Sequence, residues 1–293
     1  MLRTRLWMGA LLIAVVVAVF WIDAYLGRFP FLFLLLVIAL AWVGCFELLS
    51  LLQPVARPLS WLCYLGIALL LVANLPAHLG GFFLELSRNP WTWVAGTFTG
   101  VVLLVFVAEM ATFQEPGQSV LRIALTIWII VYLAWLPSYL VQIRWPAGTS
   151  IEDAAQLAKI GTLSLALAVF IPKCCDIGAY FTGRFLGRNR MAPVLSPKKT
   201  WEGAAGGLIA AAGATIGIDR FGPALPSIWA EVGFGLTVGA AGMVGDLAES
   251  LIKRDCRQKD ASQVVPGFGG VLDVVDAILF AAPVAYCWLS YQK

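Results

Sequence analysis

The stretch IWAEVGFGLTVGAAGMVGDLAESLIKR, residues 228–254, decides the fold class of this chain. Its apolar run from Ile228 to Ile252 is long enough to cross a bilayer as an α-helix, which needs about 20 residues. The run nevertheless carries Asp246 and Glu249 near its end. Each acid inside a membrane costs about 2.5–3.5 kcal/mol on insertion scales. The stretch therefore predicts a membrane helix whose polar face points away from lipid.

The composition of the whole chain agrees with a membrane protein. Of its 293 residues, 60% are hydrophobic and 13% are charged, whereas a soluble domain carries about 25% charged residues. We therefore expect an all-α fold, a polytopic integral membrane helix bundle. About nine transmembrane helices are expected, at residues 6–27, 31–52, 60–76, 91–113, 119–143, 160–183, 203–219, 228–252 and 271–291.

The distribution of basic residues indicates the orientation of these spans. With the N-terminus in the cytoplasm, most Lys and Arg residues fall on the cytoplasmic side, as the positive-inside rule requires. The sequence thus predicts N-in and C-out. The first segment contains Asp23 and lacks a small-x-small cleavage site, so we expect it to be retained rather than removed as a signal peptide.

Charge and metal-ligand content exclude two classes of function. The net charge of +3 and the lack of a basic tail argue against a nucleic-acid partner. The six cysteines show no CxxC spacing, and His78 is the only histidine. A zinc site needs a cluster of such ligands, so zinc is excluded.

The sequence divides into two regions that differ in polar content. Residues 1–159 form a hydrophobic N-terminal helical region of about five spans. Its few acids in spans are Asp23, Glu47 and Glu109, which we expect near the interface or solvated. Residues 160–293 hold about four spans and most of the polar groups, and we expect them to be the catalytic membrane region.

The polar face of the opening stretch has helical spacing. Asp246, Glu249, Ser250 and Lys253 follow one another at i, i+3, i+4 and i+7, which places them on one side of a helix. An internal ion pair between Glu249 and Lys253 is the structural alternative to a functional site. That alternative leaves Asp246 without an explanation.

A second pair of acids follows a glycine-rich segment in VVPGFGGVLDVVDAILF, residues 264–280. Asp273 and Asp276 lie three residues apart at the start of an apolar helix. Carboxylate pairs on one face are typical ligands for Mg²⁺, and glycine-rich backbone at a helix N-terminus binds phosphate well. A plain turn is the alternative for the glycines alone.

Basic residues surround these acids in the sequence. The segment KRDCRQKD, residues 253–260, could clamp phosphate or anchor to anionic lipid headgroups. LSPKKTWEG, residues 195–203, lies on the same predicted side, as does Asp176 at the end of the preceding span. Phosphate-binding groups and Mg²⁺ ligands at a membrane surface suggest a nucleotide acting on a lipid phosphate.

These motifs resemble the CDP-diacylglycerol synthase family, also called phosphatidate cytidylyltransferases. The family signature reads roughly S-x-x-K-R-x4-K-D-x-[GSA]-x3-P-G-H-G-G-x-x-D-R-x-D. Residues 250–276 of this chain are similar to it, and residues 176–180 and 196–203 are similar to the family's upstream blocks. Two positions depart from the signature: Phe268 replaces the usual histidine and Val274 the usual arginine.

The resemblance implies an Mg²⁺-dependent enzyme that converts CTP and phosphatidate to CDP-diacylglycerol and pyrophosphate in phospholipid biosynthesis. The implied partners are CTP, phosphatidate and the lipid bilayer, with a homodimer as a candidate assembly. The implied location is a bacterial inner membrane with the active site at the cytoplasmic face. The resemblance also implies these site residues: Asp246, Asp273, Lys253 and Lys259 as catalytic; Asp176, Asp246, Asp273 and Asp276 as metal ligands; and Ser196, Lys198, Lys199, Thr200, Glu202, Ser250, Arg254, Asp260, Gly267, Gly269 and Gly270 as substrate-binding.

Three alternatives stay open from the sequence. A CTP-dependent polyprenol or phytol kinase has a similar C-terminal region, but the Ser-Pro-Lys-Lys-Thr block favours the cytidylyltransferase. An inactive homologue is suggested by Phe268 and Val274. An ion-coupled transporter would use the buried acids as a cation relay, but the sequence shows no internal repeat, which transporters of that kind commonly carry.

Overall fold

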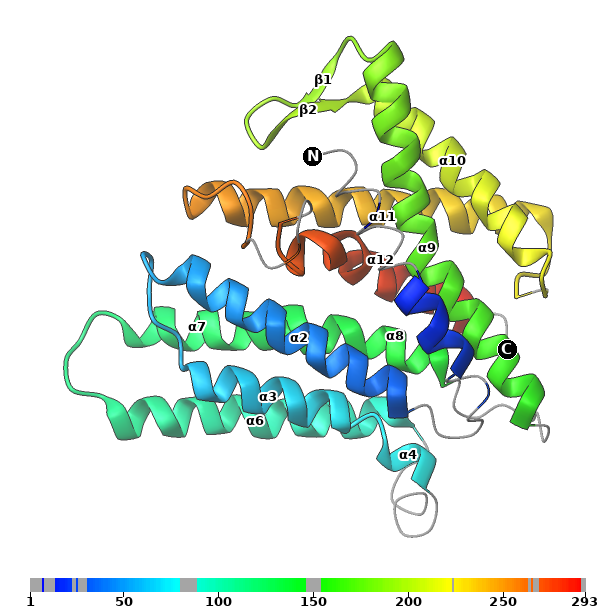
Figure 1. The fold of residues 1–293 in the computed structure, drawn as a ribbon. Helices are drawn as coiled ribbons and strands as arrows, with labels where there is room; N and C mark the ends of the chain where they lie inside the picture. Colours follow the sequence, from blue (N-terminus) through cyan, green and yellow to red (C-terminus); the bar gives the residue numbers. More distant parts are fainter. Residues whose placement is uncertain are drawn as a thin grey trace. The chain divides into compact units, whose positions relative to one another are not determined.

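The computed structural model describes residues 7, 14–22, 25, 31–79, 89–145, 154–222, 224–262, 265 and 269–290. Most of these residues lie in α-helices, so the predicted all-α class is confirmed. One short two-stranded sheet interrupts the helices (Figure 1). The chain divides into two compact units.

The first unit contains the N-terminal helices. They are α2 (Phe31–Leu52), α3 (Ser60–Val72), α4 (Pro76–Leu79), α6 (Pro90–Thr112), α7 (Ser119–Ile130), the π-helical turn η1 (Val131–Trp135) and most of α8 (Leu136–Arg144). The segment of residues 261–271 also belongs to this unit, although it lies between two helices of the other unit in the sequence.

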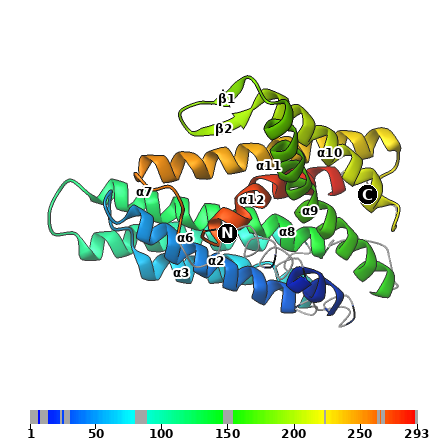
Figure 2. The same ribbon diagram turned by 45° about the horizontal axis from the view of Figure 1, so that its top comes forward.

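The second unit contains the C-terminal elements. They are α9 (Ala154–Leu186), β1 (Arg190–Ala192), β2 (Ser196–Thr200), α10 (Trp201–Asp219), α11 (Ile228–Asp255) and α12 (Leu272–Ser290). The four helices pack against one another. The strands form an antiparallel hairpin beyond the end of α9, which both ribbon views show (Figures 1 and 2).

Six helical stretches in the described part of the chain are long and apolar enough to cross a membrane. They are α2, α6, the continuous run Ser119–Arg144, Gln156–Leu186 of α9, α11 and α12. The integral membrane class is therefore confirmed. The other predicted spans differ. Helix α3 is apolar but has 13 residues, and α10 is diluted by glycines and by acids at its ends. Half of residues 6–27 lie outside the described residues.

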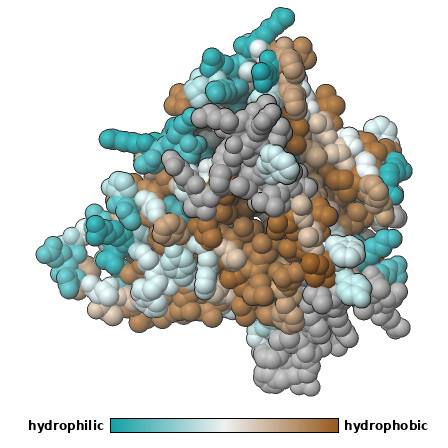
Figure 3. Space-filling model, viewed as in Figure 1, coloured by the Kyte–Doolittle hydropathy of each residue, from teal (hydrophilic) through white to brown (hydrophobic). Residues whose placement is uncertain are grey.

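The surface of the protein is apolar along the spanning helices. Large apolar side chains are exposed on the spanning helices, as expected where a helix meets lipid rather than water. Figure 3 shows hydrophobic residues over much of the face in view and hydrophilic residues over the hairpin of the second unit. The hairpin is thus the part of that unit suited to water or lipid headgroups.

Of the two expected positions for Glu47 and Glu109, near the interface or solvated, the solvated one is wrong. The structure leaves Glu47 fully buried in α2 and Glu109 only 3% exposed in α6. Arg122 of α7 lies 3.4 Å from the Glu109 carboxylate, so that acid is paired inside the first unit. The sequence pattern could not reveal that Arg122 is the partner of Glu109, because Arg122 lies on a different helix.

Small residues bring the helices of the second unit together. A Cβ on Gly178 of α9 would lie 2.4 Å from the Cβ of Ala210 in α10. A Cβ on Gly245 of α11 would lie 2.5 Å from the backbone oxygen of Asp276 in α12. Such close backbone approach is typical of membrane helix pairs with small interfacial residues.

Candidate active site

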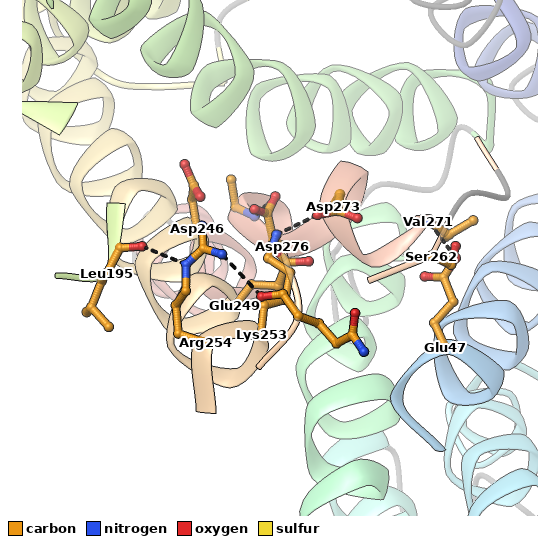
Figure 4. Close-up of polar contacts among 12 residues, drawn as sticks. Glu47, Leu195, Asp246, Glu249, Lys253, Arg254, Ser262, Val271, Asp273 and Asp276 are labelled. Carbon is orange, nitrogen blue, oxygen red and sulfur yellow. Dashed lines mark hydrogen bonds and ion pairs between the residues drawn. The ribbon is translucent and has the colours of Figure 1, made fainter. Parts of the chain in front are cut away.

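Lys253 joins the two acid pairs that the sequence singles out. Its Nζ donates to the carboxylate of Glu249, one turn earlier on α11, at 2.5 Å and to the carboxylate of Asp273 on α12 at 2.5 Å. All three side chains are at most 10% exposed. The predicted ion pair between Glu249 and Lys253 therefore exists, but it is one part of a larger group (Figure 4).

Three carboxylates gather beside this lysine. Ligand atoms of Asp246, Glu249 and Asp276 all lie within 4.8 Å of one another. Oε2 of Glu249 accepts from Lys253, whereas its Oε1 is buried without a hydrogen-bond partner among the described residues. A buried carboxylate oxygen without a donor is unfavourable unless a cation compensates it. The group therefore fits a divalent metal ion, which prefers oxygen ligands.

Two further lysines border these acids. Lys173 of α9 lies 3.4 Å from the carboxylate of Asp276 and 3.5 Å from that of Asp176. Lys199 of β2 lies 2.7 Å from the carboxylate of Asp246. The site is thus a connected set of charged side chains from α9, β2, α11 and α12, all within the second unit.

The hairpin that carries Lys199 is fixed by local hydrogen bonds. Thr200 caps α10 by accepting from the backbone N–H of Gly203 at 3.1 Å. The Glu202 carboxylate accepts from the backbone N–H groups of Arg188 and Asn189. Hydrogen bonds from its own backbone N–H and from that of Arg188 lower the pKa of Glu202 to about 2. Thr200 and Glu202 therefore hold the hairpin against the start of α10.

Other predicted phosphate-binding side chains lie at the surface of the second unit. Lys198, Arg254 and Lys259 are exposed, as is Asp260. Arg254 also donates to the backbone oxygen of Leu195 at 3.4 Å, which connects the end of α11 to the hairpin. Ser196 is half-buried in β2 and Ser250 is 8% exposed on the polar face of α11.

The polar face of α11 is turned inward as predicted. Glu249, Ser250 and Lys253 are each 8% exposed or less. Val244 and Leu251, on the other side of the helix, are more than half exposed. The helix therefore presents Glu249, Ser250 and Lys253 to the unit's interior, whereas Asp246 is partly exposed.

Comparison with known proteins decides the family. The sequence model of the cytidylyltransferase family matches residues 3–292. This chain belongs to the cytidylyltransferase family. The resemblance drawn from the motifs is thus confirmed, and with it the class of nucleotidyltransferase.

Several curated members of the family are similar to the chain. It is 32% identical over 247 residues to a phosphatidate cytidylyltransferase of Synechocystis, covering 76% of this chain and 75% of the relative. It is 30% identical over 273 residues to the phosphatidate cytidylyltransferase of Bacillus subtilis, covering 93% of both. It is 43% identical over 111 residues to that of Brucella suis, covering 38% of this chain and 41% of the relative.

The metal-ligand set expected for a cytidylyltransferase differs from the one that the geometry groups. Asp246 and Asp276 are in both. The structure adds Glu249, whereas Asp273 is paired with Lys253 and Asp176 with Lys173. Glu249 lies on the polar face that the sequence predicts but is not among the site residues that the resemblance implies, although its i, i+3 spacing from Asp246 is a usable signal.

Lys173 was missed as a site residue. The signal was present, since a lysine inside a span three residues before Asp176 needs a carboxylate partner.

The glycine-rich segment is described only in part: Gly267 and Phe268 lie outside the described residues. Gly269 has φ of 110° and exchanges two backbone hydrogen bonds with Val265. A glycine suits that conformation because it carries no Cβ.

Proposed function

We propose that this cytidylyltransferase-family protein is a phosphatidate cytidylyltransferase, which makes CDP-diacylglycerol and pyrophosphate from CTP and phosphatidate. The observation that carries the proposal is the group of Asp246, Glu249 and Asp276, bordered by lysines inside a unit of membrane helices. The similarity to phosphatidate cytidylyltransferases of Synechocystis and Bacillus subtilis supports the same substrates.

The reaction needs positioning more than proton transfer. A phosphate oxygen of phosphatidate attacks the α-phosphorus of CTP, and the bond from that phosphorus to the β-phosphate oxygen breaks. The nucleophile is already an anion, so no strong base is required. The protein must instead hold two anions that repel each other and stabilise negative charge on the leaving pyrophosphate.

The charged side chains of the second unit suit this task. We assign the exposed Lys198, Arg254 and Lys259 to phosphate oxygens of the substrates. Lys199 and Lys253 are already paired with acids, so they would position those acids and share their charge with an incoming phosphate. Gly269, which the resemblance makes a substrate-binding residue, already uses its backbone N–H in a hydrogen bond to Val265, so we assign no phosphate contact to it.

The acids would hold Mg²⁺. Asp246, Glu249 and Asp276 supply the hard oxygen donors that this ion prefers, and Oε1 of Glu249 has no hydrogen-bond partner among the described residues. When bound, the ion would neutralise triphosphate charge. Asp273, which contacts Lys253, would keep that lysine's ammonium group beside Glu249.

The location and orientation follow from the same proposal. CTP is a cytoplasmic metabolite in any cell, so the charged edge of the second unit would face the cytoplasm, with N-in and C-out as the basic residues indicate. In a bacterium this membrane would be the inner one. The exposed apolar sides of the helices would leave phosphatidate tails in lipid.

Turnover of radiolabelled CTP by the purified protein in detergent tests the proposal. We expect a lipid-extractable CDP-diacylglycerol product with phosphatidate and Mg²⁺, and its loss in Asp246→Asn. Glu115→Gln, which removes an exposed acid in the first unit, should keep full activity. Product from polyprenol but not from phosphatidate, or no product from folded protein, would contradict it.

A further inference from the structure

Glu47 is a buried acid that the reaction described above does not use. It lies in the apolar helix α2 and is fully buried. An acid in such a position is unfavourable unless donors compensate it. The donors that it has therefore indicate why the position holds a carboxylate.

Two of its donors come from the segment of residues 261–271. Oε1 of Glu47 accepts from the hydroxyl of Ser262 at 2.6 Å and from the backbone N–H of Val271 at 2.9 Å (Figure 4). These donors lie more than 200 residues from Glu47 in the sequence. One oxygen atom thus connects both ends of the segment to α2.

Gly270 makes this contact feasible. A Cβ at that position would lie 2.6 Å from Oε2 of Glu47, which is closer than real Cβ contacts. The interior of the segment is constrained as well, because Val265 and Gly269 exchange backbone hydrogen bonds at 2.7 and 3.0 Å. Among the described residues of the segment, Ser262 and Val271 are therefore held by Glu47, and Val265 and Gly269 are held by each other.

The constraint reaches the candidate active site through the covalent chain. Val271 directly precedes α12, which begins at Leu272. Asp273, two residues after Val271, is the partner of Lys253. The helix that carries Asp273 and Asp276 therefore begins at the residue after Val271, whose backbone N–H Glu47 binds.

We propose that Glu47 is a positioning residue for nucleotidyl transfer, which acts by holding Ser262 and Val271, the residue that directly precedes α12. This role rests on the proposed function, and it gives the N-terminal region a specific part in the reaction. A displacement of about 1 Å in a catalytic group can cost about 100-fold in rate, so loss of this contact should act mainly on kcat.

Kinetics of three variants test the role. We expect Glu47→Ala to lower kcat by about 10- to 100-fold with a smaller change in the KM for CTP. Glu47→Gln keeps an oxygen at the same position and should restore most of the activity. Ser262→Ala removes one donor and should cost less than Glu47→Ala. It should cost nothing further in the Glu47→Ala background, because both changes remove the same hydrogen bond.

A matched control and a second readout separate this role from general folding effects. Glu109→Gln removes another buried acid of the first unit, whose partner is Arg122, and should leave kcat unchanged. Hydrogen exchange of the amides in residues 261–271 should speed up in Glu47→Ala and not in Glu109→Gln. If Glu47→Ala does not fold, Ser262→Ala with the exchange measurement still decides the question.

Three results would overturn the proposal: wild-type kcat in Glu47→Ala, unchanged exchange of residues 261–271 in that variant, or an equal loss of activity in Glu109→Gln. Failure of the proposed function has a different signature. In that case the wild-type protein would not turn over CTP with phosphatidate, while the exchange measurement would still report whether Glu47 holds the segment.

Discussion

The Nζ atom of Lys199, on a hairpin strand, lies 2.7 Å from the carboxylate of Asp246, on a membrane-spanning helix. Both side chains are partly exposed, at 23% and 31%, so this pair should stabilise the fold by about 1 kcal/mol or less. Because Lys199 lies beside the group formed by Asp246, Glu249 and Asp276, we expect its removal to affect activity more than stability. We expect Lys199→Ala to lower kcat/KM for CTP at least about 10-fold with little change in thermal stability.

The control for this prediction is Lys159→Ala, which removes an exposed lysine near the start of α9. Thermal unfolding and steady-state kinetics of both variants in the same detergent provide the measurement. A large loss of stability in Lys199→Ala without a matching loss of kcat/KM would mean that the pair serves folding alone.

Removal of Lys253 should destabilise the protein strongly. Glu249 and Asp273 would both lose their shared ammonium partner in a buried site. Breaking a buried ion pair by removing one partner costs about 3–5 kcal/mol. We therefore expect a large fall in the melting temperature of Lys253→Met, together with loss of activity.

The double variant Lys253→Met, Glu249→Gln tests whether the pairing of Lys253 with Glu249 is the source of this stability. Neutralising Glu249 removes one of the two acids that lose the ammonium group of Lys253, so the double variant should be more stable than Lys253→Met alone. Thermal unfolding of the two variants measures this coupling. If the second substitution lowers the melting temperature further, the pairing of Lys253 with Glu249 is not what stabilises the site.

Glu202 should make the hairpin sensitive to acid. Its pKa is lowered from 4.5 to about 2 in the fold, so the folded state favours the carboxylate. The stability that Glu202 contributes is fully present above about pH 4.5 and is lost as the pH falls through about 2. Wild type should therefore be more stable than Glu202→Gln at neutral pH, and the difference should shrink on acidification.

Melting temperatures of both proteins from pH 7 to about pH 2 would check the sign. A difference that stays constant across this range would show that the hydrogen bonds to Arg188 and Asn189 do not depend on the charge of Glu202. A difference that grows toward low pH would contradict the assigned direction of the pKa shift.

The sequence predicts most of this site because its spacing is local. Asp246, Glu249, Ser250 and Lys253 share one helix face by periodicity alone, and the buried polar face of α11 agrees with that pattern. The apolar runs predict the spanning helices for the same reason. Short α3, with 13 residues, shows the limit of that approach, because an apolar run does not specify where a helix ends.

Contacts between distant elements could not be read in the same way. Nothing near Glu47 in the sequence indicates that Ser262 and Val271 compensate it, so a solvated position was the simpler expectation. The same holds for Glu249, whose pairing with Lys253 is local while its proximity to Asp276 depends on how α12 packs. The sequence thus identifies acids in apolar helices, but which residues contact them depends on how the helices pack.

The choice between the two sets of metal ligands can be tested without an activity assay. Binding of Mg²⁺ to the folded state should raise the melting temperature. The stabilisation would be about 2.7 kcal/mol at a concentration 100 times the dissociation constant. Chelation with EDTA should reverse the shift. Because Glu249 supplies a buried oxygen without a hydrogen-bond partner among the described residues, Glu249→Gln should abolish most of the shift.

Asp176→Asn is the matched variant. Its carboxylate lies 3.5 Å from Lys173 and outside the group formed by Asp246, Glu249 and Asp276. We expect it to retain the Mg²⁺-dependent shift, although it carries the same change of charge as Glu249→Gln. Loss of the shift in Asp176→Asn but not in Glu249→Gln would favour the ligand set that the family signature implies over the one that the geometry groups.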